Sequence, residues 1–234
     1  MYPARQKFLV LGLSRSGIAA AEFLLERKAK VYVYDDLPDE KTDDASARLE
    51  GLGAERLAKE DLPKMHESCD ALVLSPGIPV DHPVAVAFKR SGKAVVGETE
   101  LAARYMRCPV VAVTGTNGKT TTVSIIEKIL TEGGLKAHAC GNIGAPMIGF
   151  VSLPETEIAV AEISSFQLET LGSLCPHVGV VLNVTEDHLN RHYNMENYIF
   201  LKGKLLKNST EAEYAVLNYD DGLSLIHISE PTRH

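Results

Sequence analysis

The stretch that decides the fold is VVAVTGTNGKTTTVSIIEKIL, residues 110–130. It begins with an apolar run typical of a buried strand, passes through a loop rich in glycine and threonine, and continues at helical spacing from Lys119. We therefore predict a strand, a phosphate-binding loop and a helix that extends from residue 119 to about residue 132. This order of elements is typical of nucleotide-binding α/β proteins.

The loop is two residues shorter than a strict P-loop, G-x-x-x-x-G-K-[ST], because only two residues separate Gly115 from Gly118. Backbone amides at the start of a helix point at a common position and bind anions, so the shorter loop keeps its cradle. Lys119 adds a positive charge, and the hydroxyl of Thr120 is suited to bind Mg²⁺. A plain strand-to-helix turn is the alternative. The predicted ATP-binding residues are Gly115, Thr116, Asn117, Gly118, Lys119, Thr120 and Thr121.

Composition narrows the class of protein. The chain has 234 residues, of which 45% are hydrophobic and 24% charged, and its net charge is −7. These values are typical of a folded globular protein, and the negative charge argues against non-specific binding to nucleic acid or anionic membranes. The four cysteines are scattered without metal-ligand spacing, which favours a reducing compartment. With no run of about 20 apolar residues and no signal-peptide pattern, we expect a cytoplasmic protein.

Short β-branched runs alternate with helical patterns along the chain, which predicts an α/β fold with mainly parallel sheets. A fresh strand–loop–helix unit starts after Arg107, so we place a domain boundary there. The first domain is predicted to span residues 1–107. The second domain, which resembles a P-loop NTPase, is predicted to span residues 108–222 and to be incomplete.

The first domain carries a broken dinucleotide fingerprint, VLGLSRSG at residues 10–17, in which Ser14 stands in the position of the middle glycine. Asp35 ends the second predicted strand and is placed like the acidic residue that binds a ribose in NAD enzymes. The pattern predicts a Rossmann-like domain, and an NAD dehydrogenase is the natural rival interpretation. Against it, the sequence shows no hydride-transfer site, and the glycine that lets a pyrophosphate approach is missing.

The final segment, residues 223–234, does not continue the α/β alternation. Its sequence LSLIHISEPTR shows neither helical nor strand periodicity and resembles the translation of a transposon-type sequencing adapter. We expect this segment to be non-native and the gene to be interrupted near Gly222. A native irregular C-terminus is the alternative.

Two polar residues follow apolar strands of the second domain. Glu162 ends the run EIAVAE, and His188 follows the run VGVVLNV. The carboxyl ends of parallel strands share one edge of a sheet, where ligands of open α/β sheets collect. We therefore predict that Glu162 binds Mg²⁺ beside Thr120; a strand-end glutamate that faces solvent is the alternative. A histidine in the position of His188 is by itself more often a surface or capping residue.

Five motifs of the second domain together resemble the Mur ligase family, which also includes the folylpolyglutamate synthetases. They are GTNGKTT (115–121), GNIG (141–144), AEISSFQLE (161–169), NVTEDHLNRH (183–192) and MENYIFLKGK (195–204). With LSPGIP and GETELA in the first domain, the resemblance covers roughly residues 5–222. The SSFQLE motif resembles the corresponding motif of those family members that add D-glutamate to UDP-N-acetylmuramoyl-L-alanine.

The resemblance implies an ATP-dependent ligase of peptidoglycan precursor synthesis, and hence a role in cell-wall biogenesis, cell shape and cell division. Its substrates would be UDP-N-acetylmuramoyl-L-alanine and D-glutamate, joined through an acyl phosphate with the help of ATP and two Mg²⁺ ions. We expect the full-length protein to be a monomer that binds neither nucleic acid nor membrane. In the family the D-glutamate-binding domain lies beyond the last residue of this sequence, so we expect the chain as written to be inactive. The alternatives are another ligase of the family, or a nucleotide-binding fragment without catalysis.

The resemblance also assigns roles within the second domain. His188 becomes a second Mg²⁺ ligand, with His192 as the competing candidate. Lys202 becomes the lysine that the family carbamylates, with Lys204 left open. Burial would help this reaction, because carbon dioxide reacts only with a free amine and burial lowers the pKa of a lysine. The implied catalytic residues are Lys119, Glu162, His188 and Lys202, and the implied metal ligands are Thr120, Glu162, His188 and Lys202.

Substrate contacts follow from the same resemblance. In the first domain, Ser16 and Gly17 would lie near the diphosphate of the UDP group and Asp35 near its uridine. Residues of the second domain would contact the muramoyl-alanine part or the metal shell. Turn chemistry alone also explains several of these residues. The implied substrate-binding residues are Ser16, Gly17, Asp35, Ser75, Pro76, Gly77, Asn142, Ser164 and Gln167.

Overall fold

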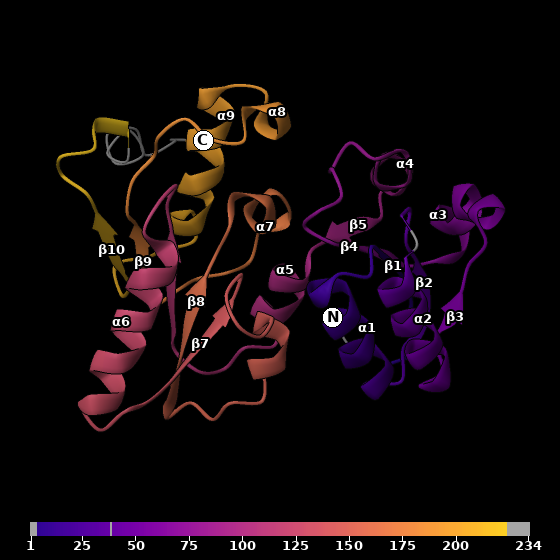
Figure 1. Cartoon of the computed structure of the whole chain (residues 1–234), viewed down its shortest axis with the longest axis horizontal. Coiled ribbons are helices and arrows are strands. Elements are labelled where there is room, and N and C mark those ends of the chain that lie inside the picture. Colours follow the sequence, from indigo (N-terminus) through magenta and orange to yellow (C-terminus); the bar gives the residue numbers. More distant parts are fainter. Residues whose placement is uncertain (1–3, 38, 224–234) are drawn as a thin grey trace. The chain divides into compact units, whose positions relative to one another are not determined.

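The structure is a computed structural model that describes residues 4–37 and 39–223. The chain folds as two compact units that divide between Arg104 and Tyr105, and each unit is built around its own five-stranded sheet (Figure 1). We call them the N-terminal unit and the C-terminal unit. The predicted tail, residues 223–234, lies outside the described residues except for Leu223.

The N-terminal unit is a parallel sheet in the order β3-β2-β1-β4-β5 with helices in the crossovers. Its strands are β1 (Lys7–Leu11), β2 (Lys30–Tyr34), β3 (Glu55–Arg56), β4 (Ala71–Leu74) and β5 (Ala94–Val96). Its helices are α1 (Arg15–Glu26), α2 (Glu40–Gly51), the 3₁₀ helix η1 (Lys59–Lys64), α3 (Met65–Ser68), α4 (Pro83–Arg90) and α5 (Glu98–Ala103). Strand order reverses at β1, between β2 and β4, as in Rossmann-like folds. The predicted fold class of this half is confirmed.

The middle strand of this sheet is buried on both faces, which explains its continuous apolar sequence. Four of the five residues of β1 are buried, and Leu9 pairs with Tyr32 of β2 and Leu72 of β4. The core on one face gathers Leu9, Leu72 and Phe88. Buried parallel strands read as unbroken apolar runs of this kind.

The glycine fingerprint brings α1 close to the end of β1. A Cβ atom at Gly17 would lie 1.9 Å from the carbonyl oxygen of Gly12, so only glycine fits there. Gly12 itself has a φ of 91°, and a Cβ on it would lie 2.6 Å from the Cβ of Ser75. The two glycines are therefore explained by close packing of loop and helix.

The C-terminal unit is a second parallel sheet, in the order β10-β9-β6-β8-β7. Its strands are β6 (Val110–Thr114), β7 (Lys136–Gly141), β8 (Glu157–Glu162), β9 (Val178–Val181) and β10 (Tyr214–Leu217). Its helices are α6 (Lys119–Glu132), η2 (Met147–Phe150), α7 (Ser165–Thr170), α8 (Leu189–His192), α9 (Met195–Gly203) and η3 (Lys204–Leu206). The mainly parallel α/β architecture predicted for this half is confirmed.

The register of this sheet brings several strand ends to one edge. Val113 of β6 pairs with Glu162 of β8, and Thr114 pairs with Val181 of β9. The loops that follow β6, β8 and β9 therefore emerge side by side. Helix α6 has the bounds predicted from the sequence and packs on β7 and β8 (Figure 1).

Helices α2 and α7 were not predicted from the sequence, and neither were the four-residue helices α3 and α8. Only Ser46 and Leu49 of α2 are buried, so this mostly polar helix lacks a clear apolar stripe. Helix α7 has six residues and begins inside the SSFQLE motif, which is too short for helical periodicity to show. Among the described residues, no helix has the length and apolar character needed to cross a membrane.

Candidate nucleotide and metal site

The loop before α6 is held in place by the segment that follows β9. The backbone amide of Thr116 donates to the carbonyl of Asn183 at 3.0 Å. The side chain of Asn183 accepts from the amide of Asn117 at 2.9 Å and donates to its carbonyl at 3.0 Å. Asn183 therefore acts as a clamp on the loop. Asn183 begins the motif NVTEDHLNRH, but the sequence alone did not predict a role for it.

Gly118 lets the loop turn into α6. It precedes the first helical residue with a φ of 83°, in the left-handed region that favours glycine. The ammonium of Lys119 folds back over the loop and donates to the carbonyls of Gly115 and Thr116, at 2.8 and 2.9 Å. A cation and the amino terminus of a 14-residue helix thus meet at one point, an arrangement that attracts phosphate.

Glu162 lies beside the start of α6, as the sequence predicted. Thr120 donates its hydroxyl to Glu162 Oε2 at 2.7 Å, and Asn142 donates its amide to Oε1 at 2.7 Å. Glu162 is only 2% exposed, and its backbone carbonyl accepts from the backbone amide of Asn142. Hydroxyl and carboxylate oxygens are ligands that Mg²⁺ prefers, so the donor set fits this metal.

Gly141 makes this approach possible. Its φ is 93°, and a Cβ there would lie 2.4 Å from the carbonyl oxygen of Glu162. The GNIG motif therefore begins with a residue that lets β7 turn tightly against the end of β8. The turn carries Asn142 to the carboxylate of Glu162.

His188 stands apart from this pair. Within the described ranges, no group of three or more His, Cys, Asp and Glu side chains is arranged to hold a metal. The His188 side chain is half-exposed, with Nε2 3.4 Å from Asp187 Oδ2 and its ring centroid 4.9 Å from that of Phe166. Thr120 and Glu162 are therefore the candidate metal ligands beside the loop.

The two candidate histidines have different surroundings. His192 is buried, its Nε2 lies 3.0 Å from Ser165 Oγ, and its ring stacks on Tyr198 with centroids 5.4 Å apart. Burial lowers the pKa of His192, which favours the neutral ring. Because His192 is used in packing, His188 is the more accessible of the two.

Lys202 is buried near the same loop. Its side chain is 1% exposed, and its ammonium lies 4.5 Å from the ring centroid of Tyr198. Burial, aided by repulsion from Lys119, lowers the pKa of Lys202 to about 7. Lys204 instead donates to the carbonyls of Leu168 and Glu169 at the end of α7. The choice of Lys202 over Lys204, left open by the sequence, is favoured by this difference.

Ser164 and Gln167 form a capping box at the start of α7. The Ser164 hydroxyl accepts from the amide of Gln167 at 3.3 Å, and Gln167 Oε1 accepts from the amide of Ser164 at 2.8 Å. Gln167 is buried. Helix capping accounts for both residues without a ligand.

The predicted residues of the N-terminal unit gather around the glycine loop. Asp35 accepts from the amide of Leu13 at 2.6 Å and from the amide of Leu37 at 2.9 Å, so its carboxylate joins the ends of β1 and β2. Ser75 is buried and shares a hydrogen bond of 2.5 Å with Ser14. The turn that Pro76 and Gly77 continue therefore starts beside the loop that leads to Ser16.

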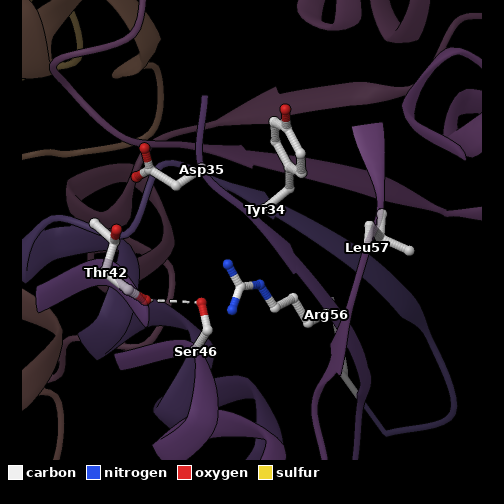
Figure 2. A pocket seen from close by; sticks show the side chains of 6 residues that line it. All are labelled: Tyr34, Asp35, Thr42, Ser46, Arg56 and Leu57. Carbon is white, nitrogen blue, oxygen red and sulfur yellow. Dashed lines mark hydrogen bonds between the residues drawn. The ribbon is translucent and has the colours of Figure 1, made fainter. Parts of the chain in front are cut away.

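Asp35 also lines a small pocket at the ends of β2 and β3 (Figure 2). The guanidinium of Arg56 extends into this pocket toward Thr42 and Ser46 of α2, and Tyr34 lies on the opposite side. Arg56 pairs with Asp43 at 2.5 Å, while Ser46 donates to the carbonyl of Thr42. The pocket offers a cation and a phenol next to the carboxylate predicted to face a nucleoside.

Fold and geometry together define a two-unit α/β protein with a P-loop-like strand, loop and helix in its second unit. Residues 6–97 match the family model described as the MurD-like N-terminal domain of Mur ligases, and residues 113–233 match the Mur ligase middle domain. The chain belongs to the Mur ligase family. The predicted family is confirmed, and it replaces the rival interpretation as an NAD dehydrogenase.

Curated relatives include two named UDP-N-acetylmuramoylalanine–D-glutamate ligase. That of Pelotomaculum thermopropionicum is 44% identical over 226 residues, a match that covers 94% of this chain and 49% of the relative. That of Geobacter metallireducens is 43% identical over 218 residues, covering 92% of this chain and 48% of the relative. The chain spans about half the length of the curated relatives it matches.

Solved structures support the fold. A UDP-N-acetylmuramate:L-alanyl-γ-D-glutamyl-meso-diaminopimelate ligase from Neisseria meningitides matches with a TM-score of 0.63 at 18% identity, covering 97% of this chain and 75% of that chain. The UDP-N-acetylmuramate-alanine ligase MurC from Thermotoga maritima matches with a TM-score of 0.54 at 20% identity, covering 94% and 50%. At these identities the likeness concerns the fold alone.

Proposed function

We propose that this chain is the nucleotide-binding part of a ligase that joins D-glutamate to UDP-N-acetylmuramoyl-L-alanine at the expense of ATP. The observation that carries the proposal is the 2.7 Å contact between Thr120 and Glu162 at the mouth of the phosphate loop. It pairs a hydroxyl with a carboxylate where the terminal phosphates of ATP would lie. The names of the curated relatives support the choice of D-glutamate as the added amino acid.

In the proposed reaction, the carboxylate of the muramoyl-alanine substrate attacks the γ-phosphorus of ATP, and ADP leaves. The amine of D-glutamate then attacks the acyl carbon, the amide forms, and phosphate leaves. Loop amides and Lys119 would hold the phosphates, while Thr120 and Glu162 would hold Mg²⁺. The metal supplies neutralisation of the negative charge on the transferred group.

Lys202 and His188 would serve the acyl substrate. With a pKa near 7, Lys202 has a free amine available at neutral pH. Its nitrogen can bond to the carbon of carbon dioxide and release a proton, which gives an anionic carbamate. The carbamate and His188 would then provide ligands for a second Mg²⁺, on the side of the site formed by α9.

The N-terminal unit would bind the UDP group. Ser16 and Gly17 lie in the first turn of α1, whose amino terminus suits a diphosphate, and Asp35 lines the pocket that would receive the nucleoside. Binding energy from such a remote group can be used to position the reacting carboxylate. The proposed enzyme is a cytoplasmic monomer, with no nucleic-acid or membrane partner.

Calorimetric titration of the purified chain with ATP and Mg²⁺ tests the proposal. We expect ATP binding that depends on Mg²⁺. Lys119→Ala should abolish this binding, and Glu162→Gln should remove its dependence on Mg²⁺. An amide-forming assay with UDP-N-acetylmuramoyl-L-alanine and D-glutamate should give no product with this chain. Product is expected once the chain is extended to the length of its relatives. Binding that is indifferent to Lys119 and to Mg²⁺ would contradict the proposed site.

A further inference from the structure

Helix α8 is one turn long and lies between two residues with unusual backbone geometry. His188, which precedes it, has a φ of 52°, and Tyr193, which follows it, has a φ of 69°. Outside glycine, such conformations are strained and persist only where the surroundings enforce them. Something therefore holds this turn in place.

A buried ion pair provides the anchor. Arg191 of α8 donates to both carboxylate oxygens of Glu169 on α7, through Nε to Oε1 at 2.9 Å and through Nη2 to Oε2 at 2.6 Å. The side chains of Glu169 and Arg191 are 7% and 15% exposed. A two-pronged pair of this kind fixes direction as well as distance, which a lysine could not do.

The pair reaches His188 through an aromatic ring. The guanidinium carbon of Arg191 lies 5.3 Å from the ring centroid of Phe166, and that centroid lies 4.9 Å from the ring of His188. The Oε1 atom of Glu169 also lies 3.4 Å from Nδ1 of His192, so the same carboxylate contacts the last two residues of the short helix. Neither Glu169 nor Arg191 belongs to the phosphate loop or to the predicted metal ligands.

The anchored turn is also tied to the nucleotide loop. His192 stacks on Tyr198, and the hydroxyl of Tyr198 lies 3.2 Å from Thr116 Oγ1 in the loop. Thr116 Oγ1 in turn accepts from the amide of Thr185, three residues before His188. Contacts thus run from the ion pair to the loop on both sides of His188.

We propose that Glu169 and Arg191 are positioning residues, which set the place of the His188 ring relative to the phosphate loop. The use of this placement, to hold His188 as a metal ligand, rests on the proposed function. The placement itself does not, because its contacts are present in the chain without ligands. It assigns Glu169 a function beyond the stability of α7.

The first test needs no nucleotide. In protein labelled at histidine and phenylalanine, nuclear Overhauser contacts between the rings of His188 and Phe166 report the placement. We expect Glu169→Gln and Arg191→Lys to weaken these contacts severalfold while the chain stays folded. The matched control is Glu100→Gln in the N-terminal unit. Glu100 is likewise buried and pairs with an arginine, since Nε and Nη2 of Arg104 both lie 2.8 Å from Glu100 Oε1. This control should leave the contacts unchanged at a comparable loss of melting temperature.

The second test uses Mn²⁺ with ADP as the probe. Partners that orient a metal ligand typically affect metal affinity about 10–100-fold, so we expect the Kd for Mn²⁺–ADP to rise at least about tenfold in Glu169→Gln. Paramagnetic broadening of the His188 ring signal should fall with it, and Glu100→Gln should affect neither. The wild-type protein could fail to bind Mn²⁺–ADP while Glu169→Gln still weakens the ring contacts. That result would refute the nucleotide site and leave the positioning role intact. Lower stability with unchanged ring contacts in both variants would overturn the positioning role.

Discussion

At the scale of single residues, the candidate site depends on side chains that hold other groups rather than on those that face solvent. Asn183 makes two hydrogen bonds to Asn117, and Asn142 makes one to the carboxylate of Glu162. Each fixes a group that the sequence motif alone leaves free to rotate. Pre-organised ligands bind phosphate and metal more tightly because less ordering is left for the moment of binding.

Removal of the Asn183 clamp should weaken nucleotide binding. Asn183→Ala deletes two hydrogen bonds worth about 1 kcal/mol each, so we expect the Kd for Mg²⁺–ATP to rise at least about fivefold. Asn208→Ala is the matched control, because Asn208 also bridges two backbone carbonyls, those of Gly172 and Leu174. Titration calorimetry of both variants makes the comparison. Equal affinity in Asn183→Ala and wild type would argue against the clamp.

Lys202 should make stability depend on pH. The pKa of Lys202 is about 7 in the folded chain, below the ordinary lysine value of 10.5, so between these values the unfolded chain binds more protons than the folded one. The free energy of unfolding should therefore rise with pH across this window, by at most about 1.4 kcal/mol per pH unit from this group. Below pH 7 Lys202 is charged in the folded chain as well, and the full cost of burying this charge lowers the free energy of unfolding.

The Lys202→Met variant removes this contribution. We expect it to raise the free energy of unfolding most at pH 6.5 and progressively less toward pH 10, as measured by urea denaturation. Lys128→Met on the exposed surface of α6 is the control and should leave the pH dependence unchanged. The same pH slope in Lys202→Met and wild type would mean that the buried amine is protonated throughout.

At the scale of elements, the glycine fingerprint of the N-terminal unit is a packing device. Gly17 sits where α1 passes over the loop from β1, and the carbonyl of Gly12 occupies the space of a side chain. Asp35 then joins that loop to the end of β2 through the amide of Leu13. The amino terminus of α1 is thereby placed at the sheet edge where a diphosphate is expected.

A methyl group at position 17 should force α1 away from β1. We expect Gly17→Ala to lower the free energy of unfolding of the N-terminal unit by about 1–3 kcal/mol, the usual range for overpacking. Gly51→Ala at the end of α2 is the control, because a Cβ there meets nothing within 4 Å and alanine is the better helix former. Denaturant melts of the two variants should move in opposite directions. An undisturbed Gly17→Ala would show that the helix can shift freely.

At the scale of the whole molecule, the C-terminal unit exposes several large apolar side chains. Ile125 and Ile129 lie one turn apart on α6 and are 52% and 63% exposed. Tyr214 and Val216 are also exposed, and they lie on β10, the edge strand of this sheet among the described residues. Apolar faces and open strand edges of this kind favour association between chains.

Charged side chains on α6 should reduce that association. We expect the double variant Ile125→Lys, Ile129→Glu to shift the chain toward a monodisperse species in size-exclusion chromatography with light scattering. Leu52→Lys in the N-terminal unit is the control, since Leu52 is similarly exposed and lies directly after α2. A monodisperse wild-type chain at high concentration would contradict the prediction.

Local sequence determined the architecture of this protein. Apolar runs predicted strands such as β1 and β6, and the pattern after Lys119 predicted α6 with its observed bounds, because burial periodicity is written in consecutive residues. The order of strands and helices also predicted that Glu162 would emerge beside Thr120, since parallel strands end at a common edge. The family resemblance rested on motifs of the same local kind.

Tertiary structure alone decided which polar residues serve the site and which serve the fold. Ser164 and Gln167 have the local S-x-x-Q spacing of a capping box, whereas Asn183 holds a loop 66 residues away, which its neighbours in sequence do not predict. Burial separated Lys202 from Lys204 and His192 from His188, and it joined Glu169 to Arg191. Desolvation and pairing depend on what distant segments place around a group, and no local pattern encodes that environment.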